Sequence, residues 1–506
     1  MIRLTGNTLT LQEVLNVADG FEEVELSDDA AARVDAARAV VDRQAAADVP
    51  VYGINTGFGA LAETTIPRAE LATLQVNLLR SHAAGVGEPL PARAVRATML
   101  LRANVLAKGF SGIRRSTLDQ LLVLLNHRVH PVVPSRGSVG ASGDLAPLAH
   151  LALVLIGEGE AMVGDDPVAR PGGEALAAAG VKPIALAPKE GLALINGTQP
   201  SAAVAALSAA GAERLARAAD IAAALSVDGL RGSVRPFDPR IHDARPYAGQ
   251  RVSAGNLRRL LEGSGINKSH EHCGRVQDAY SLRCAPQVHG AAREALAFVH
   301  SILMTEANAA TDNPMVFAGD GEIVSGGNFH GAPVSIAADL LAIALAQLAT
   351  ISERRSDRLV NPALSELPAF LTPRSGLQSG YMMAQVTAAA LASELKTLAH
   401  PASVDTIPTS ANREDHVSMS MGAALKASRA LELATRVVAI EILFGCQALD
   451  LLEPLKSSAI LQRVHRRVRE RVPRLTDDRP PAPDIETISR MIADGSFEAA
   501  CGADVK

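Results

Sequence analysis

Apolar residues fill almost every face of several long stretches of the chain. From 336 to 351 (IAADLLAIALAQLATI) the apolar pattern is interrupted only by Asp339, Gln347 and Thr350. A helix that is apolar nearly all round must be buried by neighbours on every side. Similar alanine-rich stretches occupy 200–226, 291–311, 382–399 and 421–452. Their length, without a repeat of fixed period, predicts a bundle of long helices.

The first 200 residues have a different pattern, in which glycine-bearing loops separate shorter helical stretches. These loops lie at 52–60, 108–112 and 136–144. Strand-like and helix-like stretches do not alternate, which disfavours a doubly wound α/β fold. The sequence therefore predicts a mainly α protein in three parts, which are a loop-rich N-terminal lobe over 1–200, a central long-helix bundle over 201–452 and a short C-terminal helical tail over 453–506.

Composition and charge narrow the class of protein. Of the 506 residues 48% are hydrophobic, only 3% are aromatic and none is Trp, so small aliphatic side chains must fill the interior, as in closely packed helices. The formal net charge is -5 and no basic stripe stands out, which argues against nucleic acid or an anionic membrane as a partner. The four cysteines form no C-x-x-C pair, and neither a secretion signal nor a long uninterrupted apolar run is present. We therefore expect a cytoplasmic protein without a membrane span.

The segment GSVGASGDLAPLAH (137–150) carries the most distinctive chemistry. A phosphate-binding loop would need G-x-G-x-x-G or a following Lys-Ser/Thr, and neither is present. A loop that caps a helix starting near Asp144 is a second interpretation, which accounts for only part of the pattern. In a third, the amide nitrogen of Gly143 attacks the carbonyl carbon of Ala141 and closes a five-membered ring, because glycine lets the backbone approach closely. Loss of two waters, one from ring closure at Ala141 and one from the side chain of Ser142, then leaves a methylene, and the product is a covalent electrophile.

Seven further motifs accompany this segment in order along the chain. They are YGINTGFG (52–59), RSHAAGVG (80–87), EGLALINGTQ (190–199), VQDAYSLRCAPQV (276–288), DNPMVF (312–317), SGGNFHGAPV (325–334) and HPASVDTIPTSANREDHVSM (400–419). With these motifs the sequence resembles the aromatic amino acid ammonia-lyase and aminomutase family over nearly its whole length. The resemblance implies a mainly helical fold whose loop-rich lobe carries a prosthetic group, 4-methylidene-imidazol-5-one (MIO). This group forms autocatalytically from Ala141-Ser142-Gly143, with no metal and no dissociable organic cofactor.

The reaction that the resemblance implies is elimination of ammonia across the Cα–Cβ bond of an amino acid. An amine is a poor leaving group and the β-hydrogen is weakly acidic, so covalent activation and a positioned base are both needed. Tyr52 matches the family's base, although an isolated loop tyrosine would ordinarily bond to backbone. Arg283, otherwise a surface ion-pair residue, matches the group that binds the substrate carboxylate through its planar fork. The resemblance also places in this site the catalytic Tyr280 and the substrate-binding Gln277 and Asn196, and it places Phe329 beside the prosthetic group. Without the resemblance, Asn196 would be interpreted as a turn former and Phe329 as a core or loop aromatic.

His82 and Glu414 match the positions at which family members with different substrates differ. Ser-His at 81–82 also occurs in some tyrosine-specific relatives, so Glu414 is the more informative of the two. A carboxylate bonds to an imidazole N–H, whereas the phenylalanine and tyrosine enzymes usually carry Gln at the matching position. A phenyl ring would leave a buried carboxylate unpaired, at a cost of about 1–3 kcal/mol or more. Arg413 stands where the histidine-specific members commonly have Gln, and it either points away or pairs with Glu414.

The resemblance is closest to the histidine-specific members of the family. It implies conversion of L-histidine to urocanate and ammonia by a homotetramer whose active sites draw residues from three subunits. The alternatives are a tyrosine or phenylalanine ammonia-lyase, a related aminomutase, and a catalytically silent helical scaffold with an uncyclised Ala-Ser-Gly loop. The stretch His270-Glu271-His272-Cys273 resembles a metal-ligand set, but its two histidines diverge on a helix and no partner pair follows, so no metal site is expected.

Overall fold

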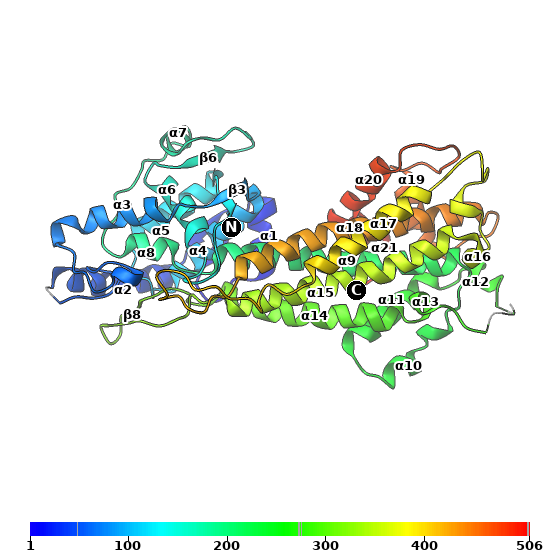
Figure 1. The fold of residues 1–506 in the computed structure, drawn as a ribbon, viewed down its shortest axis with the longest axis horizontal. Helices are drawn as coiled ribbons and strands as arrows, with labels where there is room; N and C mark the ends of the chain where they lie inside the picture. The colour runs from blue at the N-terminus through cyan, green and yellow to red at the C-terminus, as the bar shows by residue number, and fades with distance from the viewer. Residues whose placement is uncertain (48, 272–273, 275, 503–504) are drawn as a thin grey trace. The chain divides into compact units, whose positions relative to one another are not determined.

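The computed structural model describes residues 1–47, 49–271, 274, 276–502 and 505–506 (Figure 1). The chain forms two compact units, each made of three segments. Unit 1 contains Met1–Leu207, His300–Asp339 and Pro401–Leu425, and unit 2 contains Ser208–Val299, Leu340–His400 and Lys426–Lys506. Each unit is therefore discontinuous in sequence, whereas the three parts expected from the sequence are continuous stretches.

Unit 1 combines short helices with small sheets and many loops. Its helices are α1 (Leu11–Gly20), α2 (Asp28–Ala46), α3 (Leu71–His82), α4 (Ala92–Ala107), α5 (Arg115–Asn126), α6 (Leu145–Leu155), α7 (Gly172–Ala178) and α8 (Glu190–Ile195), with short 3-10 helices η1 (Gly59–Leu61) and η2 (Arg68–Glu70). Helix α4 is buried on nearly every side and packs against α1 and α5. A capping box starts α1, because Thr10 accepts a hydrogen bond from the N–H of Glu13 and Glu13 accepts one from the N–H of Thr10.

The strands that the structure describes are all short and all belong to unit 1. Strand β1 (Ile2–Leu4) pairs parallel to β2 (Val24–Leu26), and the other pairs are antiparallel. These are β3 (Val86–Pro89) with β5 (Pro134–Arg136), β6 (Glu160–Val163) between β4 (Val129–Pro131) and β7 (Arg170–Pro171), and β8 (Met315–Phe317) with β9 (Glu322–Val324). Short strands among many helices confirm the mainly α class.

The alanine-rich stretches form the long helices that their pattern predicts. These are α9 (Gln199–Gly229), α14 (Ala285–Ala307), α15 (Ala332–Val360), α17 (Met382–Leu398) and α18 (Ser420–Leu451). Among the described helices, α15 alone has the length and composition of a membrane span, with a mean hydropathy of 2.0 over its most apolar window. Of that window 67% is buried, as is usual for the core helix of a bundle.

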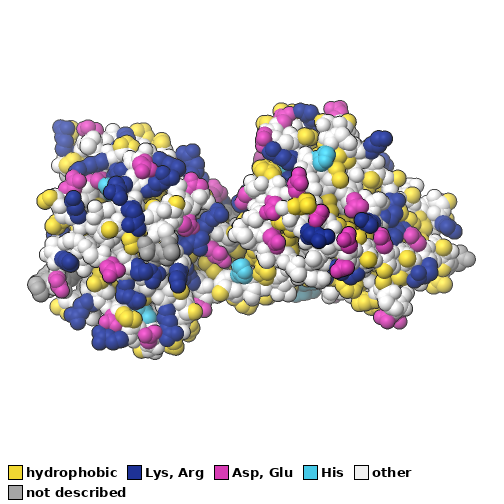
Figure 2. Space-filling model, turned by 180° about the vertical axis from the view of Figure 1, so that it is seen from behind, with side chains coloured by type: hydrophobic (Ala, Val, Ile, Leu, Met, Phe, Trp, Pro, Cys, Tyr) yellow, Lys and Arg dark blue, Asp and Glu magenta, His cyan; other side chains and the backbone are white. Residues whose placement is uncertain are grey.

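Unit 2 contains the remaining helices. They are α10 (Pro239–Asp243), α11 (Ala248–Leu261), α12 (Gly265–Lys268), α13 (Tyr280–Arg283), α16 (Pro362–Ser365), α19 (Ala459–Arg469), α20 (Ala482–Ala493) and α21 (Ser496–Cys501), with 3-10 helices η3 (Arg235–Phe237) and η4 (Ala369–Leu371). The visible face in Figure 2 mixes Lys and Arg with Asp and Glu, without a stripe of one sign.

A buried ionic network holds the short helix α13 in unit 2. Arg355 and Glu441 are both fully buried and form two hydrogen bonds, Nε to Oε1 at 2.5 Å and Nη2 to Oε2 at 2.8 Å. The remaining Nη1 of Arg355 donates to the carbonyl oxygen of Ser281 at 3.3 Å. Ser281 lies between Tyr280 and Arg283, so this guanidinium fixes the backbone that carries two of the residues assigned to the site from the sequence.

A buried carboxyl group in unit 2 makes stability depend on pH. Burial raises the pKa of Asp228 from 3.8 to about 6, although the hydroxyls of Ser264 and Ser457 donate to it. A raised folded-state pKa gives stability that is full below the unfolded pKa and is lost as pH rises through about 6. Between pH 4 and pH 8, the free energy of unfolding of the wild type should fall by up to about 3 kcal/mol more than that of the Asp228→Asn variant. Denaturant titration of both proteins at each pH measures this difference. Equal pH dependence in the two proteins would contradict this assignment.

Candidate active site

A cavity of about 710 Å³ lies within unit 1. Its wall contains six of the residues assigned to the site from the sequence. The full lining is Tyr52, Phe58, Gly59, Leu61, Leu74, Asn77, Leu78, Ser81, His82, Ser142, Leu145, Leu192, Asn196, Asn313, Phe329, Ser410, Ala411 and Glu414. Leucine side chains therefore supply an apolar wall, and a few polar groups converge on it, as is usual for a small-molecule site.

The ends of three packed helices bring the polar groups together. His82 is the last residue of α3, Ser142 lies in the loop just before α6, and Asn196 caps the C-terminus of α8. Helix α6 packs against both α3 and α8, and α3 packs against α8. Residues more than a hundred positions apart thus meet at one cavity because their helices end there.

The Ala141-Ser142-Gly143 loop is bent and closely packed against the segment after α8. Gly143 has φ +73°, and a Cβ at this position would lie 2.2 Å from the carbonyl oxygen of Gly197. Asn196 donates from Nδ2 to the carbonyl oxygen of Ser142 at 2.9 Å. Gly143 and Gly197 form an isolated parallel bridge through the N–H of Asp144, and among the described residues the N–H of Gly143 itself has no hydrogen-bond partner.

Asp144 anchors the C-terminal side of this loop. Its N–H donates to Gly197 O at 2.8 Å, and its carboxyl group accepts from the hydroxyl of Ser138 at 2.6 Å and from the N–H of Ser201 at 2.9 Å. The side chain is fully buried, and burial raises the pKa of Asp144 while those two donors oppose the rise. The bend at Gly143 is therefore held from both sides.

Alanine in place of Gly143 should prevent the loop from taking this shape. The added Cβ would overlap backbone atoms of Gly197, which cannot yield as a flexible side chain would, and a positive φ is costly for alanine. We expect Gly143→Ala to keep both waters that ring closure would release, as measured by intact mass. A variant lighter by two waters than its own sequence gives would show that this contact does not restrict the loop.

Glu414 faces Ser142 directly across the cavity. The hydroxyl of Ser142 donates to Oε1 of Glu414 at 2.7 Å, and the hydroxyl of Thr409 donates to Oε2 at 2.7 Å. Glu414 is half-buried and lines the cavity. Arg413 is exposed and, within the described part of the chain, forms no ion pair with Glu414. The carboxylate is thus held by two hydroxyl groups, and its charge faces the cavity.

Tyr52 and Phe329 come to the same cavity from loops. The backbone N–H of Gly59 points at Oη of Tyr52 at 3.5 Å, in the glycine-rich loop that precedes and includes η1. Phe329 lies between β9 and α15, and the neighbouring His330 stacks on His416 with ring centroids 5.8 Å apart. His330 also contacts the carbonyl oxygen of His416 through Nε2 at 3.1 Å. This pair ties the Phe329 loop to the segment that carries Glu414.

His82 is half-buried at the end of α3, and the carbonyl oxygen of Leu78 holds its ring. Burial lowers the pKa of His82, while the bond to the Leu78 carbonyl and the charge of Glu414 act in the opposite direction. Nδ1 lies 2.9 Å from Leu78 O, and a carbonyl only accepts, so Nδ1 carries the proton. In the neutral form of the ring, Nε2 of His82 is a hydrogen-bond acceptor.

The backbone of Asn196 is held by a buried arginine. Arg102 is fully buried and donates from Nη1 to Asn196 O at 2.7 Å and to Gln199 Oε1 at 2.7 Å, and Nη2 donates to Ala193 O. Burial lowers the pKa of Arg102 to about 10, which leaves it charged near neutral pH. The Oδ1 atom of Asn196 is buried without a partner in the described structure, so it remains available as an acceptor.

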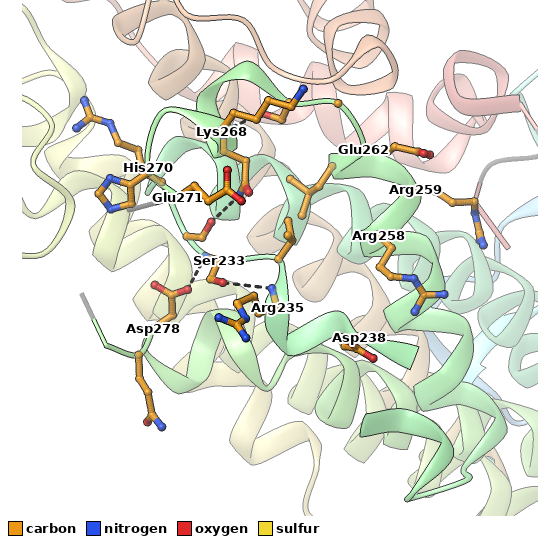
Figure 3. A pocket seen from close by; sticks show the side chains of 18 of the residues that line it. Ser233, Arg235, Asp238, Arg258, Arg259, Glu262, Lys268, His270, Glu271 and Asp278 are labelled. Atoms are coloured by element: carbon orange, nitrogen blue, oxygen red, sulfur yellow. Dashed lines mark hydrogen bonds between the residues drawn. The ribbon is translucent and has the colours of Figure 1, made fainter. Parts of the chain in front are cut away.

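Three of the residues assigned to the site belong to unit 2 and do not line this cavity. Gln277 and Tyr280 are exposed, and the guanidinium of Arg283 lies over the Tyr280 ring with Cζ 4.6 Å from its centroid. Gln277 lines a larger cavity of about 1140 Å³ within unit 2. Figure 3 shows the wall of that cavity, which mixes basic with acidic side chains and includes His270 and Glu271.

The stretch 270–273, which resembles a metal-ligand set in sequence, lies only partly within the described residues. His272 and Cys273 lie outside them, and the remaining described side chains contain no group of three or more His, Cys, Asp or Glu that could hold a metal ion. In the second cavity, the carboxylate of Asp278 accepts instead from the backbone N–H of Ser233 at 2.6 Å (Figure 3). The carboxylate of Asp278 therefore holds the loop that contains Ser233.

Comparison with known proteins decides the family. A family model described as aromatic amino acid lyase matches residues 9–470. The chain belongs to the aromatic amino acid lyase family. It is 58% identical to a histidine ammonia-lyase of Anaeromyxobacter sp. (strain K), with 98% of this chain and 99% of that protein covered. It is 56% identical to a histidine ammonia-lyase of Myxococcus xanthus, with 99% and 98% covered. The family expected from the motifs is confirmed.

Solved structures of the family have the same fold. A histidine ammonia-lyase from Trypanosoma cruzi has a TM-score of 0.93 and 46% identity, with 100% of this chain and 96% of that one covered. A tyrosine aminomutase from Streptomyces globisporus also has a TM-score of 0.93, at 37% identity, with 100% and 99% covered. The predicted helical architecture is therefore that of the family, and the fold by itself does not separate a lyase from an aminomutase.

The residues at Ala141-Ser142-Gly143 fit the prosthetic group that the family implies. The loop is bent at a glycine that tolerates no Cβ, the N–H of Gly143 is without a partner among the described residues, and the hydroxyl that would leave faces the cavity. Three residues that support the site could not be assigned to it from the sequence. Thr409 bonds to Glu414 and Arg102 bonds to Asn196. Asp144 bonds to Gly197, which follows Asn196. None of the three lines the cavity, and no periodic pattern in the sequence marks them.

Proposed function

We propose that this protein is a histidine ammonia-lyase, which converts L-histidine to urocanate and ammonia. The observation that carries the proposal is the carboxylate of Glu414 on the cavity wall, 2.7 Å from the hydroxyl of Ser142. A charged acceptor in a leucine-lined cavity favours a substrate ring that carries an N–H donor. Several relatives more than half identical over almost the whole chain are histidine ammonia-lyases, which supports the same substrate.

The prosthetic group proposed to form from Ala141-Ser142-Gly143 supplies an electron-poor double bond at the cavity wall. The chain's own residues then have separate tasks. Glu414 binds the imidazole N–H, and Asn196 offers Oδ1 as an acceptor to the substrate ammonium while it holds the Ser142 carbonyl with Nδ2. Phe329 and the leucines exclude water. This arrangement fixes the ring and the α-amino group relative to Ser142.

Tyr52 is proposed to remove the β-proton at its phenolate oxygen. The N–H of Gly59 faces this oxygen, and a donor at that position favours a negative charge on it. His82 is proposed to donate a hydrogen bond from Nδ1 to the carbonyl oxygen of Leu78 and, in its neutral form, to offer Nε2 as an acceptor.

The substrate carboxylate needs a cation, and the described residues that line the cavity in unit 1 include no Lys or Arg. We propose that Arg283, with Tyr280 and Gln277, completes the site from a neighbouring copy in a homotetramer that works in the cytoplasm. The exposed Tyr280 and the guanidinium stacked on it suit such a contact. The bond from Arg355 to Ser281 holds this short helix in shape within its own chain.

Separate incubation with L-histidine, L-tyrosine and L-phenylalanine tests the proposal. We expect urocanate from histidine, and ultraviolet spectra distinguish it from the coumarate or cinnamate that the other substrates would give. Turnover of tyrosine with none of histidine would overturn the choice of substrate. Formation of a β-amino acid as the main product would identify an aminomutase, and the absence of any turnover would favour a catalytically silent scaffold.

A further inference from the structure

Glu414 is held at its carboxyl end by a residue that lies outside the cavity wall. Thr409 and Glu414 face each other across a short turn, with the N–H of Thr409 donating to Glu414 O at 3.0 Å and the N–H of Glu414 donating to Thr409 O at 3.3 Å. The hydroxyl of Thr409 then reaches Oε2 of Glu414 at 2.7 Å. One residue therefore fixes both the backbone and the side chain of Glu414.

The turn between these two residues is strained. Ser410, Ala411 and Asn412 have φ values of 51°, 52° and 66°, which is the left-handed region that residues with a Cβ rarely adopt. Such a turn persists only where surrounding contacts determine it. The Thr409–Glu414 backbone pair closes the turn, so it places the carboxylate at the cavity wall with Ser410 and Ala411 beside it.

The two oxygens of Glu414 have different partners. Oε2 is bonded to Thr409, and Oε1 is bonded to Ser142. The hydroxyl of Ser142 is the group that leaves when the proposed prosthetic group forms, and Oε1 then faces the cavity without it. The terminal torsion of a glutamate is broad, so a carboxylate with no second anchor would rotate among several orientations. The Thr409 hydroxyl supplies that second anchor.

We propose that Thr409 is a positioning residue that sets the preference for a substrate ring with an N–H donor. The proposal rests on the proposed function of Glu414 as the imidazole-binding group. By holding Oε2, Thr409 leaves Oε1 as the acceptor that the ring meets, in one orientation. Thr409 itself is absent from the cavity wall and touches the substrate only through Glu414.

Three variants separate this role from turn stability alone. Thr409→Val keeps the shape of the side chain and removes the hydroxyl, and Thr409→Ser keeps the hydroxyl. Thr406→Val is a matched control in the same segment, because the hydroxyl of Thr406 accepts from the N–H of Val417 at 2.8 Å and has no bond to Glu414. Intact mass of each variant shows whether the Ala-Ser-Gly loop has lost its two waters.

The measurement is inhibition of histidine turnover by two products that differ only in their ring, urocanate and cinnamate. For Thr409→Val we expect the inhibition constant of urocanate to rise about 3- to 10-fold and that of cinnamate to stay the same. Thr409→Ser and Thr406→Val should match the wild type, and all variants should have the cyclised mass. Equal weakening of both products by Thr409→Val, or no weakening of either, would overturn the proposal while leaving histidine turnover established. A wild type that leaves histidine unchanged would overturn both this inference and the proposed function.

Discussion

Glu414→Gln should lower kcat/KM for L-histidine by about 10- to 100-fold, because it replaces a charged acceptor by a neutral one where the imidazole N–H binds. Glutamine keeps the size of the side chain, and its Oε1 still accepts from Thr409 or Ser142 in one orientation of the amide. A lower kcat/KM would therefore reflect the missing negative charge and not a missing side-chain volume. Steady-state kinetics with histidine and phenylalanine measures the effect.

The same substitution should change the preference between substrates. A phenyl ring offers Glu414 no donor and leaves a carboxylate unpaired, and the neutral amide removes that cost. We therefore expect kcat/KM for phenylalanine to be unchanged or higher in Glu414→Gln. Arg413→Gln serves as a control, because Arg413 is exposed and does not line the cavity. Equal losses on both substrates, or a loss in Arg413→Gln as large as in Glu414→Gln, would contradict the recognition role of Glu414.

Ser142→Ala should lower histidine turnover by at least about a thousandfold, since it removes the atom that becomes the reactive methylene. The substitution deletes only the hydroxyl, whose partner is Oε1 of Glu414. The bond from Asn196 to the carbonyl oxygen of residue 142 and the buried bonds of Asp144 do not depend on that hydroxyl. The variant should therefore fold with its cavity intact.

Two readouts separate lost chemistry from lost structure in Ser142→Ala. The variant has no side-chain hydroxyl to lose, so its mass should stay within one water of the mass that its own sequence gives. Its thermal unfolding should stay close to that of the wild type. Ser138→Ala is a useful comparison, because it removes a donor to the buried Asp144 and leaves Ser142 in place. Turnover by Ser142→Ala within about tenfold of the wild type would contradict an essential role for this side chain.

The parts of the fold that follow from local pattern were predictable from the sequence. The stretch 336–351 is apolar on nearly all faces, and it forms the interior of α15. The close backbone approach at Gly143 follows from the missing Cβ of glycine, whereas its positive φ of 73° is known only from the structure. The family motifs supplied Tyr52 and Glu414, but the bond between Ser142 and Glu414 joins residues 272 positions apart and is visible only in the fold.

The parts that escaped prediction depend on contacts that leave no pattern. Thr409 lies in an aperiodic loop, and nothing in the residue types Ser-Ala-Asn indicates three consecutive left-handed conformations. Arg102 lies inside α4 and is hidden among apolar residues, with its partners near position 196. The resemblance grouped Arg283 with Glu414, whereas in the fold they belong to different units, a division that no local pattern in the sequence indicates.

The intact mass of the purified wild-type chain tests the central claim most directly, namely that Ala141-Ser142-Gly143 becomes the electrophile of the site. The bent loop, the unpartnered N–H of Gly143 within the described structure and the hydroxyl of Ser142 facing Glu414 all favour ring closure. We predict a mass lower by two water molecules than the sequence gives, with the loss confined to the peptide that contains residues 141–143. A mass equal to that of the unmodified sequence in the folded protein would contradict the claim.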